Sequence, residues 1–149
     1  MRICFDTNVI VDIMGTTPDF KNSYAAYDTT LIKGFDPCAA LISLPDIVYL
    51  LKQRGYLKQD EARASLEDLF MMFEVLDGKY VDCREAYESE MKDFEDALIA
   101  FIAKRNKVDF IVTRNKRDFQ ASPIPALTPQ EFVEMFCPNG ITYSMHGES

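Results

Sequence analysis

The sequence predicts an α/β domain with an open sheet of mainly parallel strands. Short apolar runs alternate with segments whose apolar residues repeat at helical spacing, an order typical of parallel strands joined by helical crossovers. The 149 residues are 48% hydrophobic and 27% charged, which places the chain among globular proteins of about one domain. We expect a single domain over residues 1–137, followed by a polar C-terminal tail over residues 138–149.

The predicted strands are apolar runs that end at turn-forming or helix-capping residues. They cover residues 2–5, 38–43, 79–83 and 109–113. The predicted helices are bounded by capping residues, by Pro in a first turn or by Gly past the end. They start near Val9 and cover residues 22–33, 45–53, 60–73, 84–104 and 128–136, with a break in the longest near Lys92.

Composition excludes several classes of protein. The longest apolar runs are too short to cross a bilayer, and the first six residues lack the basic and apolar regions of a signal peptide. The four cysteines are scattered singly and the one histidine, His146, lies in the polar tail, so we expect no zinc site. We therefore expect reduced thiols and a cytoplasmic protein without membrane contact.

The net charge of −8 disfavours binding of nucleic acid by bulk electrostatics. It does not exclude an enzyme that acts on nucleic acid, because carboxylates that bind divalent cations are neutralised by the metal. The basic residues are unevenly distributed, and six of the sixteen fall within fourteen positions. These six are Lys104, Arg105, Lys107, Arg114, Lys116 and Arg117.

Polar side chains gather where the predicted strands end. Asp6 follows the first strand, Asp46 lies just beyond the second, and Thr113 ends the last strand. Asn115 and Asp118 come shortly after Thr113. Because ligands bind open parallel sheets beyond the carboxyl ends of the strands, we expect these side chains to share one edge.

Asp93 and Asp96 form a further acidic pair, three residues apart on one face of a predicted helix. The apolar residues around Asp96 indicate a helix packed on more than one side, where an unpaired carboxylate is costly. Gathered carboxylates repel each other, which raises their pKa values unless a cation compensates. Oxygen-only ligands favour Mg²⁺ or Mn²⁺, which can activate water and stabilise charge on a phosphoryl oxygen.

Four segments of the chain resemble the PIN-domain nuclease family, in particular small bacterial members similar to the VapC-type toxins of toxin–antitoxin pairs. They occur in the family's order and are ICFDTNV (residues 3–9), SLPDIVY (43–49), DFEDA (93–97) and IVTRNKRDF (111–119). The resemblance covers nearly the whole chain, roughly residues 2–135. It implies a three-layer α/β/α fold with a central parallel sheet, and metal-dependent hydrolysis of RNA phosphodiester bonds.

The resemblance also implies a catalytic set of Asp6, Asp46, Asp96, Asn115 and Asp118. Asp6 and Asp96 fall on metal ligands, and Asp46 is a third ligand that stands where the family more often has the longer Glu. Asn115 falls where many members have a fourth carboxylate, so it brings an amide oxygen without a charge. Asp118 either supplies that charge or caps the following turn.

Two further groups of residues follow from the resemblance. Thr7, Asp93 and Thr113 are placed to orient the carboxylates, and Asp93 is alternatively a ligand to a second metal. One or two Mg²⁺ ions would bind the scissile phosphate and activate a water for in-line attack. The RNA backbone would then be contacted by Arg114, Lys116 and Arg117.

Family members commonly dimerise, and the toxins are bound by a small antitoxin. The resemblance thus implies an RNA substrate, a homodimer and an antitoxin partner. The apolar residues Tyr24 and Tyr27 and the segment 69–73 either supply such an interface or belong to the core.

Two other interpretations remain open. A PIN-like domain without catalytic activity would bind RNA or protein, and the departures at Asp46 and Asn115 favour it. A receiver-like domain also has an acidic Mg²⁺ pocket at a sheet edge. However, the third predicted strand ends at Asp82-Cys83, and no lysine pattern follows Thr113. A phosphatase of the D-x-D type is excluded because Thr7 and Asn8 follow Asp6.

Overall fold

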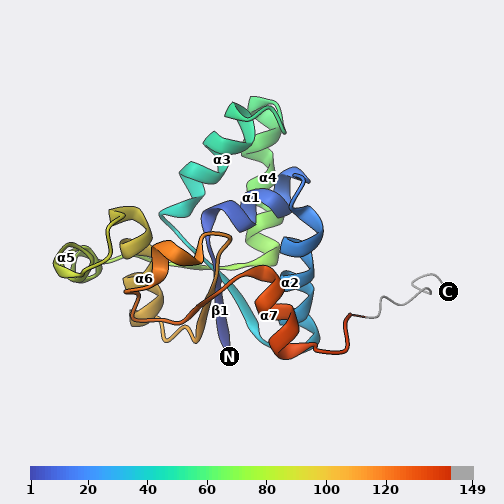
Figure 1. The fold of residues 1–149 in the computed structure, drawn as a ribbon. Helices are drawn as coiled ribbons and strands as arrows, with labels where there is room; N and C mark the ends of the chain where they lie inside the picture. Colours follow the sequence, from blue (N-terminus) through green and yellow to red (C-terminus); the bar gives the residue numbers. More distant parts are fainter. Residues whose placement is uncertain (142–149) are drawn as a thin grey trace.

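A five-stranded parallel sheet forms the centre of the molecule. The structure is a computed structural model and describes residues 1–141 (Figure 1). The strands are β1 (Arg2–Phe5), β2 (Asp36–Ala40), β3 (Glu74–Leu76), β4 (Phe110–Val112) and β5 (Ala126–Leu127). All neighbours are parallel in the order β3-β2-β1-β4-β5, so β1 is central, and Cys4 stands in register with Cys38 on one side and Ile111 on the other.

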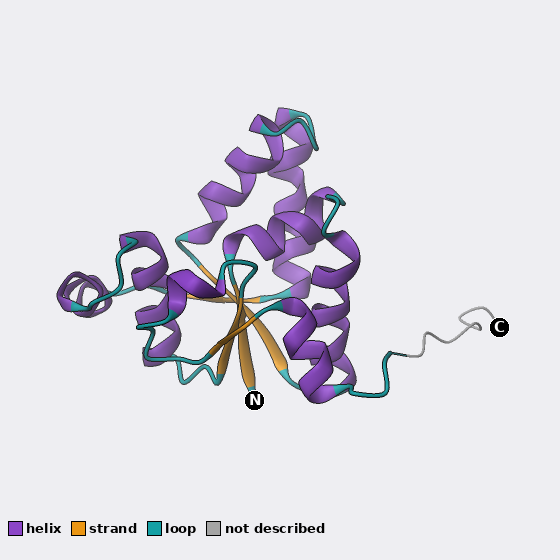
Figure 2. Cartoon of the chain, viewed as in Figure 1, coloured by secondary structure: helices purple, strands orange, loops and turns teal. Residues whose placement is uncertain are grey.

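Helices cover both faces of this sheet (Figure 2). The seven α-helices of the described residues are α1 (Thr7–Gly15), α2 (Phe20–Ile32), α3 (Ser43–Gln53), α4 (Gln59–Met72), α5 (Tyr80–Glu88), α6 (Phe94–Arg105) and α7 (Pro129–Phe136). A short 3₁₀ helix, η1 (Lys116–Phe119), follows β4. In Figure 1, α5 and α6 lie to the left of β1, and α2 and α7 lie to its right.

The alternation of side chains along β1 produces two separate cores. Ile3 and Phe5 pack with α1, α2, α3, α4 and α7 on one face, whereas Cys4 packs with α5 and α6 on the other. In β4, Val112 and Ile111 divide between the two cores in the same way. The predicted three-layer α/β/α fold with a central parallel sheet is therefore confirmed.

The third strand lies earlier in the chain than the sequence predicted. We expected residues 79–83 to be the strand, but β3 is Glu74–Leu76 and α5 begins at Tyr80. The prediction for residues 79–83 was wrong because Asp82 is a helix-capping residue. Its Oδ2 accepts a hydrogen bond from the Lys79 backbone N–H at 2.8 Å, which closes the first turn of α5.

Other boundaries differ by smaller amounts. β2 ends at Ala40 rather than residue 43, and Ser43 is already the first residue of α3. The region predicted as one helix over residues 84–104 is interrupted, as expected, between Glu88 and Phe94. The two-residue strand β5 and the helix η1 were not predicted.

The surface proposed from Tyr24, Tyr27 and residues 69–73 is divided by the fold. Tyr27, Leu69 and Phe73 belong to the core, whereas Phe70 and Met71 are exposed. Of the expected tail, residues 142–149, which include His146, lie outside the described residues. No helix among residues 1–141 has the length and apolar character needed to cross a membrane.

Candidate active site

Asp6 is held rigidly at the carboxyl end of the central strand. It is the N-cap of α1, and its Oδ1 accepts a hydrogen bond from the Thr7 backbone N–H at 2.9 Å. Its Oδ2 accepts a second hydrogen bond from Thr113 Oγ1 at 2.8 Å. Its backbone N–H donates to the Val112 carbonyl, so β4 fixes both the main chain and the side chain. Only 5% of Asp6 is exposed.

The two threonines beside Asp6 connect it to neighbouring elements. Thr7 Oγ1 donates to Ser43 Oγ at 3.0 Å, which ties the start of α1 to the start of α3. Thr113 Oγ1 accepts from the Asn115 backbone N–H at 3.0 Å while donating to Asp6. The strand ends β1 and β4 and the helix α3 are thus joined by a chain of buried hydroxyl groups. Ser43 was not among the predicted site residues.

A pocket of about 230 Å³, here called the acidic pocket, opens at this edge of the sheet. It is lined by Asp6, Thr7, Asn8, Asp93, Glu95, Asp96, Asn115 and Asp118. Six of these residues were predicted for the site from the sequence. Asp93 is the N-cap of α6, and its Oδ1 accepts from the Asp96 backbone N–H at 2.9 Å.

The carboxylates of the acidic pocket destabilise one another's charged forms. Burial, and then the charges of Asp6, Asp93 and Asp118, raise the pKa of Asp96 to about 7. Burial also raises the pKa of Asp6, although its hydrogen bonds with Thr113 and Thr7 oppose this. A carboxyl group with a pKa near 7 is half protonated at neutral pH, so a bound cation would displace that proton.

Asp46 is not among the residues that line the acidic pocket. It shares a hydrogen bond with Glu95, and this contact, followed by burial, raises the pKa of Glu95 to about 7. Asp46 therefore acts on the pocket through Glu95, which does line it. Glu95 was not predicted from the sequence, because the pairing between α3 and α6 is a tertiary contact without a local signal.

Asn115 and Asp118 reach the pocket as a pair. The Asn115 side-chain amide donates a hydrogen bond to Asp118 Oδ2, so Asp118 is within the site and not only a cap of the following turn. The amide oxygen of Asn115 is then available as a neutral ligand beside the carboxylates.

The oxygen atoms that line the acidic pocket are the type of ligand that a hard divalent cation prefers. The pocket offers oxygen ligands, most of them carboxylates whose repulsion a cation would relieve. Within residues 1–141, no three acidic, cysteine or histidine side chains are grouped closely enough to hold one ion as they stand. Binding an ion therefore requires side chains around the pocket to converge further.

The basic residues expected to contact RNA have different surroundings. Arg114 Nε and one terminal nitrogen donate to Asp12 Oδ2 and Oδ1 at 2.8 and 3.2 Å, so its guanidinium is bound to the protein. Lys116 pairs with Glu131 at 3.1 Å on an exposed surface. Among the described residues, no acidic group lies within salt-bridge distance of Arg117.

Asp12 is the centre of a buried polar cluster that was not predicted from the sequence. It is 1% exposed, and besides Arg114 it accepts hydrogen bonds from Thr17 Oγ1 and Ser23 Oγ, both at 2.7 Å. The cluster joins α1, the start of α2 and the loop after β4. An acidic residue in an apolar helix segment followed by a threonine and a serine was the available signal.

The family model and the solved structures that this chain matches agree on one family. Residues 2–117 match the model of the PIN domain. Comparison with curated proteins gave no match. The fold is similar to VapBC2 from Rickettsia felis, solved bound to a DNA fragment from the promoter, with a TM-score of 0.68 and 20% identity over 86% of this chain and 98% of that one.

Two further solved structures show the same fold. FitAcB from Neisseria gonorrhoeae has a TM-score of 0.64 and 20% identity, with 86% of this chain and 98% of that chain covered. A toxin–antitoxin complex from Klebsiella pneumoniae has a TM-score of 0.59 and 19% identity, with 85% and 97% covered. Since the family model spans most of the chain, the protein belongs to the PIN domain family, whose members are nucleases and therefore hydrolases.

Proposed function

We propose that this protein is a divalent-metal-dependent endoribonuclease and the toxin of a toxin–antitoxin pair. The observation that carries the proposal is the acidic pocket, in which carboxylates from the residue after β1, from α6 and its N-cap, and from η1 line one cavity at the carboxyl edge of the sheet. PIN nucleases generally use divalent metals, and a bound cation would favour the charged form of Asp96, whose pKa is raised by burial and by the neighbouring carboxylates.

Asp6 and Asp96 are the proposed primary ligands of Mg²⁺ or Mn²⁺, because they face the same pocket from β1 and α6. Asp118, Asp93 and the amide oxygen of Asn115 complete the donor set. When bound, the ion supplies Lewis acidity toward the phosphoryl oxygen and lowers the pKa of a water molecule. Asp46 has an indirect role in this scheme, through its hydrogen bond with Glu95.

The surrounding residues fix the ligands before the ion arrives. Thr113 and Thr7 hold both oxygens of Asp6 in place, so little conformational freedom is lost when Asp6 coordinates. Thr113 also holds the Asn115 backbone, and thereby sets the position of the loop that carries Asp118. Arg117, whose guanidinium is unpaired among the described residues, is the proposed contact to the RNA backbone, with Lys116 beside it.

The direct test is cleavage of mixed cellular RNA by the purified protein with Mg²⁺ or Mn²⁺. We expect cleavage that EDTA abolishes and that the Asp6→Asn variant lacks. A matched control is Asp36→Asn, because Asp36 is exposed and begins β2 at the opposite edge of the sheet. No cleavage by folded, partner-free protein at any metal concentration would instead favour a PIN-like binding module.

The toxin assignment is supported by the neighbouring structures, one of which is described as a toxin–antitoxin complex. We propose that a small antitoxin binds this chain and that the chain forms a homodimer. Expression of the wild type without a partner is expected to arrest growth, and Asp6→Asn is expected to be tolerated. Equal growth arrest by both forms would contradict a toxicity caused by catalysis.

A further inference from the structure

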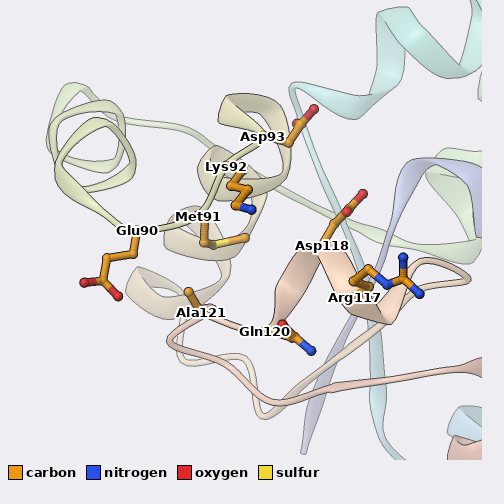
Figure 3. A pocket seen from close by; sticks show the side chains of 8 residues that line it. All are labelled: Glu90, Met91, Lys92, Asp93, Arg117, Asp118, Gln120 and Ala121. Carbon is orange, nitrogen blue, oxygen red and sulfur yellow. The ribbon is translucent and has the colours of Figure 1, made fainter.

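We infer that a second pocket, next to the acidic pocket, binds the base and a phosphate of the nucleotide adjacent to the scissile phosphate. This inference rests on the proposed ribonuclease function. The pocket has a volume of about 610 Å³ and is shown in Figure 3. We call it the flanking pocket. It is lined by Glu90, Met91, Lys92, Asp93, Arg117, Asp118, Gln120 and Ala121.

The flanking pocket adjoins the acidic pocket directly. Asp93 and Asp118 line both of them, so these two side chains form the common wall. The remaining walls come from the linker between α5 and α6 and from the residues in and after η1. An RNA chain whose phosphate lies at the acidic pocket must place a neighbouring nucleotide close by, and this pocket is adjacent.

Lys92 is an unpaired cation at this pocket. The basic side chains of the neighbouring elements are mostly engaged: Lys104 pairs with Glu85, Arg105 with Asp82 and Arg114 with Asp12. Lys92, by contrast, has no acidic group within 4.0 Å in residues 1–141. In Figure 3 it extends from the linker toward η1. A free ammonium group beside the site is suited to a phosphate of the bound RNA.

The acidic residues of the flanking pocket leave room for an anion. Figure 3 shows that the Glu90 carboxylate extends away from the other labelled side chains. Asp93 already accepts a hydrogen bond from the Asp96 backbone, and Asp118 accepts one from the Asn115 amide. Both carboxylates are also proposed to face the metal, which would neutralise much of their charge.

The rest of the lining suits a nucleobase. Ala121, which is exposed, and the accessible edge of the largely buried Met91 provide a small apolar surface against which a base can pack. The Gln120 side-chain amide, which has no hydrogen-bond partner within the described residues, can donate to and accept from a base edge. The volume lies within the range of about 300–1,000 Å³ that ligand pockets span.

The test measures binding separately from cleavage. A labelled mixed-sequence RNA decamer is titrated with protein and followed by fluorescence anisotropy, with Ca²⁺ in place of Mg²⁺ and RNA integrity verified on a gel. We expect Lys92→Gln to weaken binding about fivefold to tenfold at low salt and to reduce the salt slope by about 0.7, the value for one lost single-strand phosphate contact. Gln120→Ala is expected to weaken binding by an amount that depends on the base.

Lys107→Gln is the matched control, because Lys107 is exposed and follows the far end of α6, about 18 Å from Phe94 along the helix axis. It should bind as wild type does. Wild-type protein that cleaves RNA, together with unchanged affinity and salt slope in Lys92→Gln, overturns the flanking-pocket inference alone. Wild-type protein that neither binds nor cleaves RNA overturns the proposed function and this inference with it.

Discussion

The ion pair between the buried Asp12 and the partly exposed Arg114 gives the sharpest prediction about stability. Removing one partner of a buried ion pair costs about 3–5 kcal/mol, since the other charge is left without compensation. Arg114 has a side chain that is 35% exposed, and two hydroxyl groups still donate to Asp12. Water can therefore enter where the guanidinium was, and we expect Arg114→Met to lower the free energy of unfolding by about 2–3 kcal/mol.

A variant of Asp12, combined with Arg114→Met, isolates the interaction energy between the two residues. Asp12→Asn removes the charge but keeps the shape, and Arg114 retains Asp19 at 3.4 Å, so we expect a loss of about 1–2 kcal/mol. The double variant should lose at least about 1 kcal/mol less than the sum of the single losses, because the residues are in direct contact. Urea unfolding of all four proteins measures these values. Additive losses, or a loss below about 0.5 kcal/mol for Arg114→Met, would refute the reasoning.

This pair also bears on the site. Asp6 and Asp12 are six residues apart in and before α1, about 9 Å along the helix axis. Thr113 is bound to the first and Arg114 to the second, so the loop after β4 is attached to α1 at two consecutive residues. Arg114→Met is therefore expected to reduce cleavage under conditions in which the protein stays folded.

Three further predictions concern other parts of the molecule. Thr113→Val removes the hydrogen bond to Asp6, and we expect RNA cleavage to fall about tenfold to a hundredfold, while Thr113→Ser retains most activity. Gly15→Ala should lower the free energy of unfolding by about 1–3 kcal/mol, since a new Cβ would lie 2.8 Å from Leu51 Cδ2. Asp96, whose pKa is raised to about 7, binds more protons in the folded state than in the unfolded state. The free energy of unfolding of metal-free protein should therefore fall as pH rises from about 4 to about 7, and Asp96→Asn should flatten this dependence.

Each of these predictions has an outcome that would contradict it. Unchanged cleavage by Thr113→Val would show that the hydroxyl does not orient Asp6. An unfolding midpoint of Gly15→Ala equal to that of wild type would mean that the Leu51 side chain moves without cost. The pH series is measured by urea unfolding in EDTA. A free energy of unfolding that increases above pH 5 would show that Asp96 is not held in its protonated form.

The sequence predicted the layers of the fold better than the ends of its elements. The alternation of strands and helices was sufficient for the parallel sheet, because each apolar run is buried on both faces, as in β1. The strand predicted at residues 79–83 failed because the β-forming residues Tyr80 and Val81 lie in the first turn of a helix that Asp82 caps. The β propensity of these two residues favoured a strand, whereas the cap formed by Asp82 and the tertiary packing favoured a helix, and the helix formed.

The site residues that follow the ends of strands could be predicted from the sequence. Asp6 and Thr113 follow from the rule that parallel strands deliver their carboxyl ends to one edge. The contact between Asp46 and Glu95 joins α3 to α6, and no local pattern encodes which helices meet. The resemblance implied that Arg114 contacts RNA, whereas its ion pair with Asp12 depends on the packing of α1 and has no local signal in the sequence.

Binding of a divalent cation in the acidic pocket, through Asp6 and Asp96, underlies the whole proposed function. Titration of the protein with Mn²⁺, followed by electron paramagnetic resonance of the free ion, measures this without any substrate. We predict saturable binding by the wild type and by Asp36→Asn, with affinity reduced at least about tenfold in Asp6→Asn and in Asp96→Asn. Equal Mn²⁺ affinity in all four proteins, or no binding by folded wild type, would contradict the account.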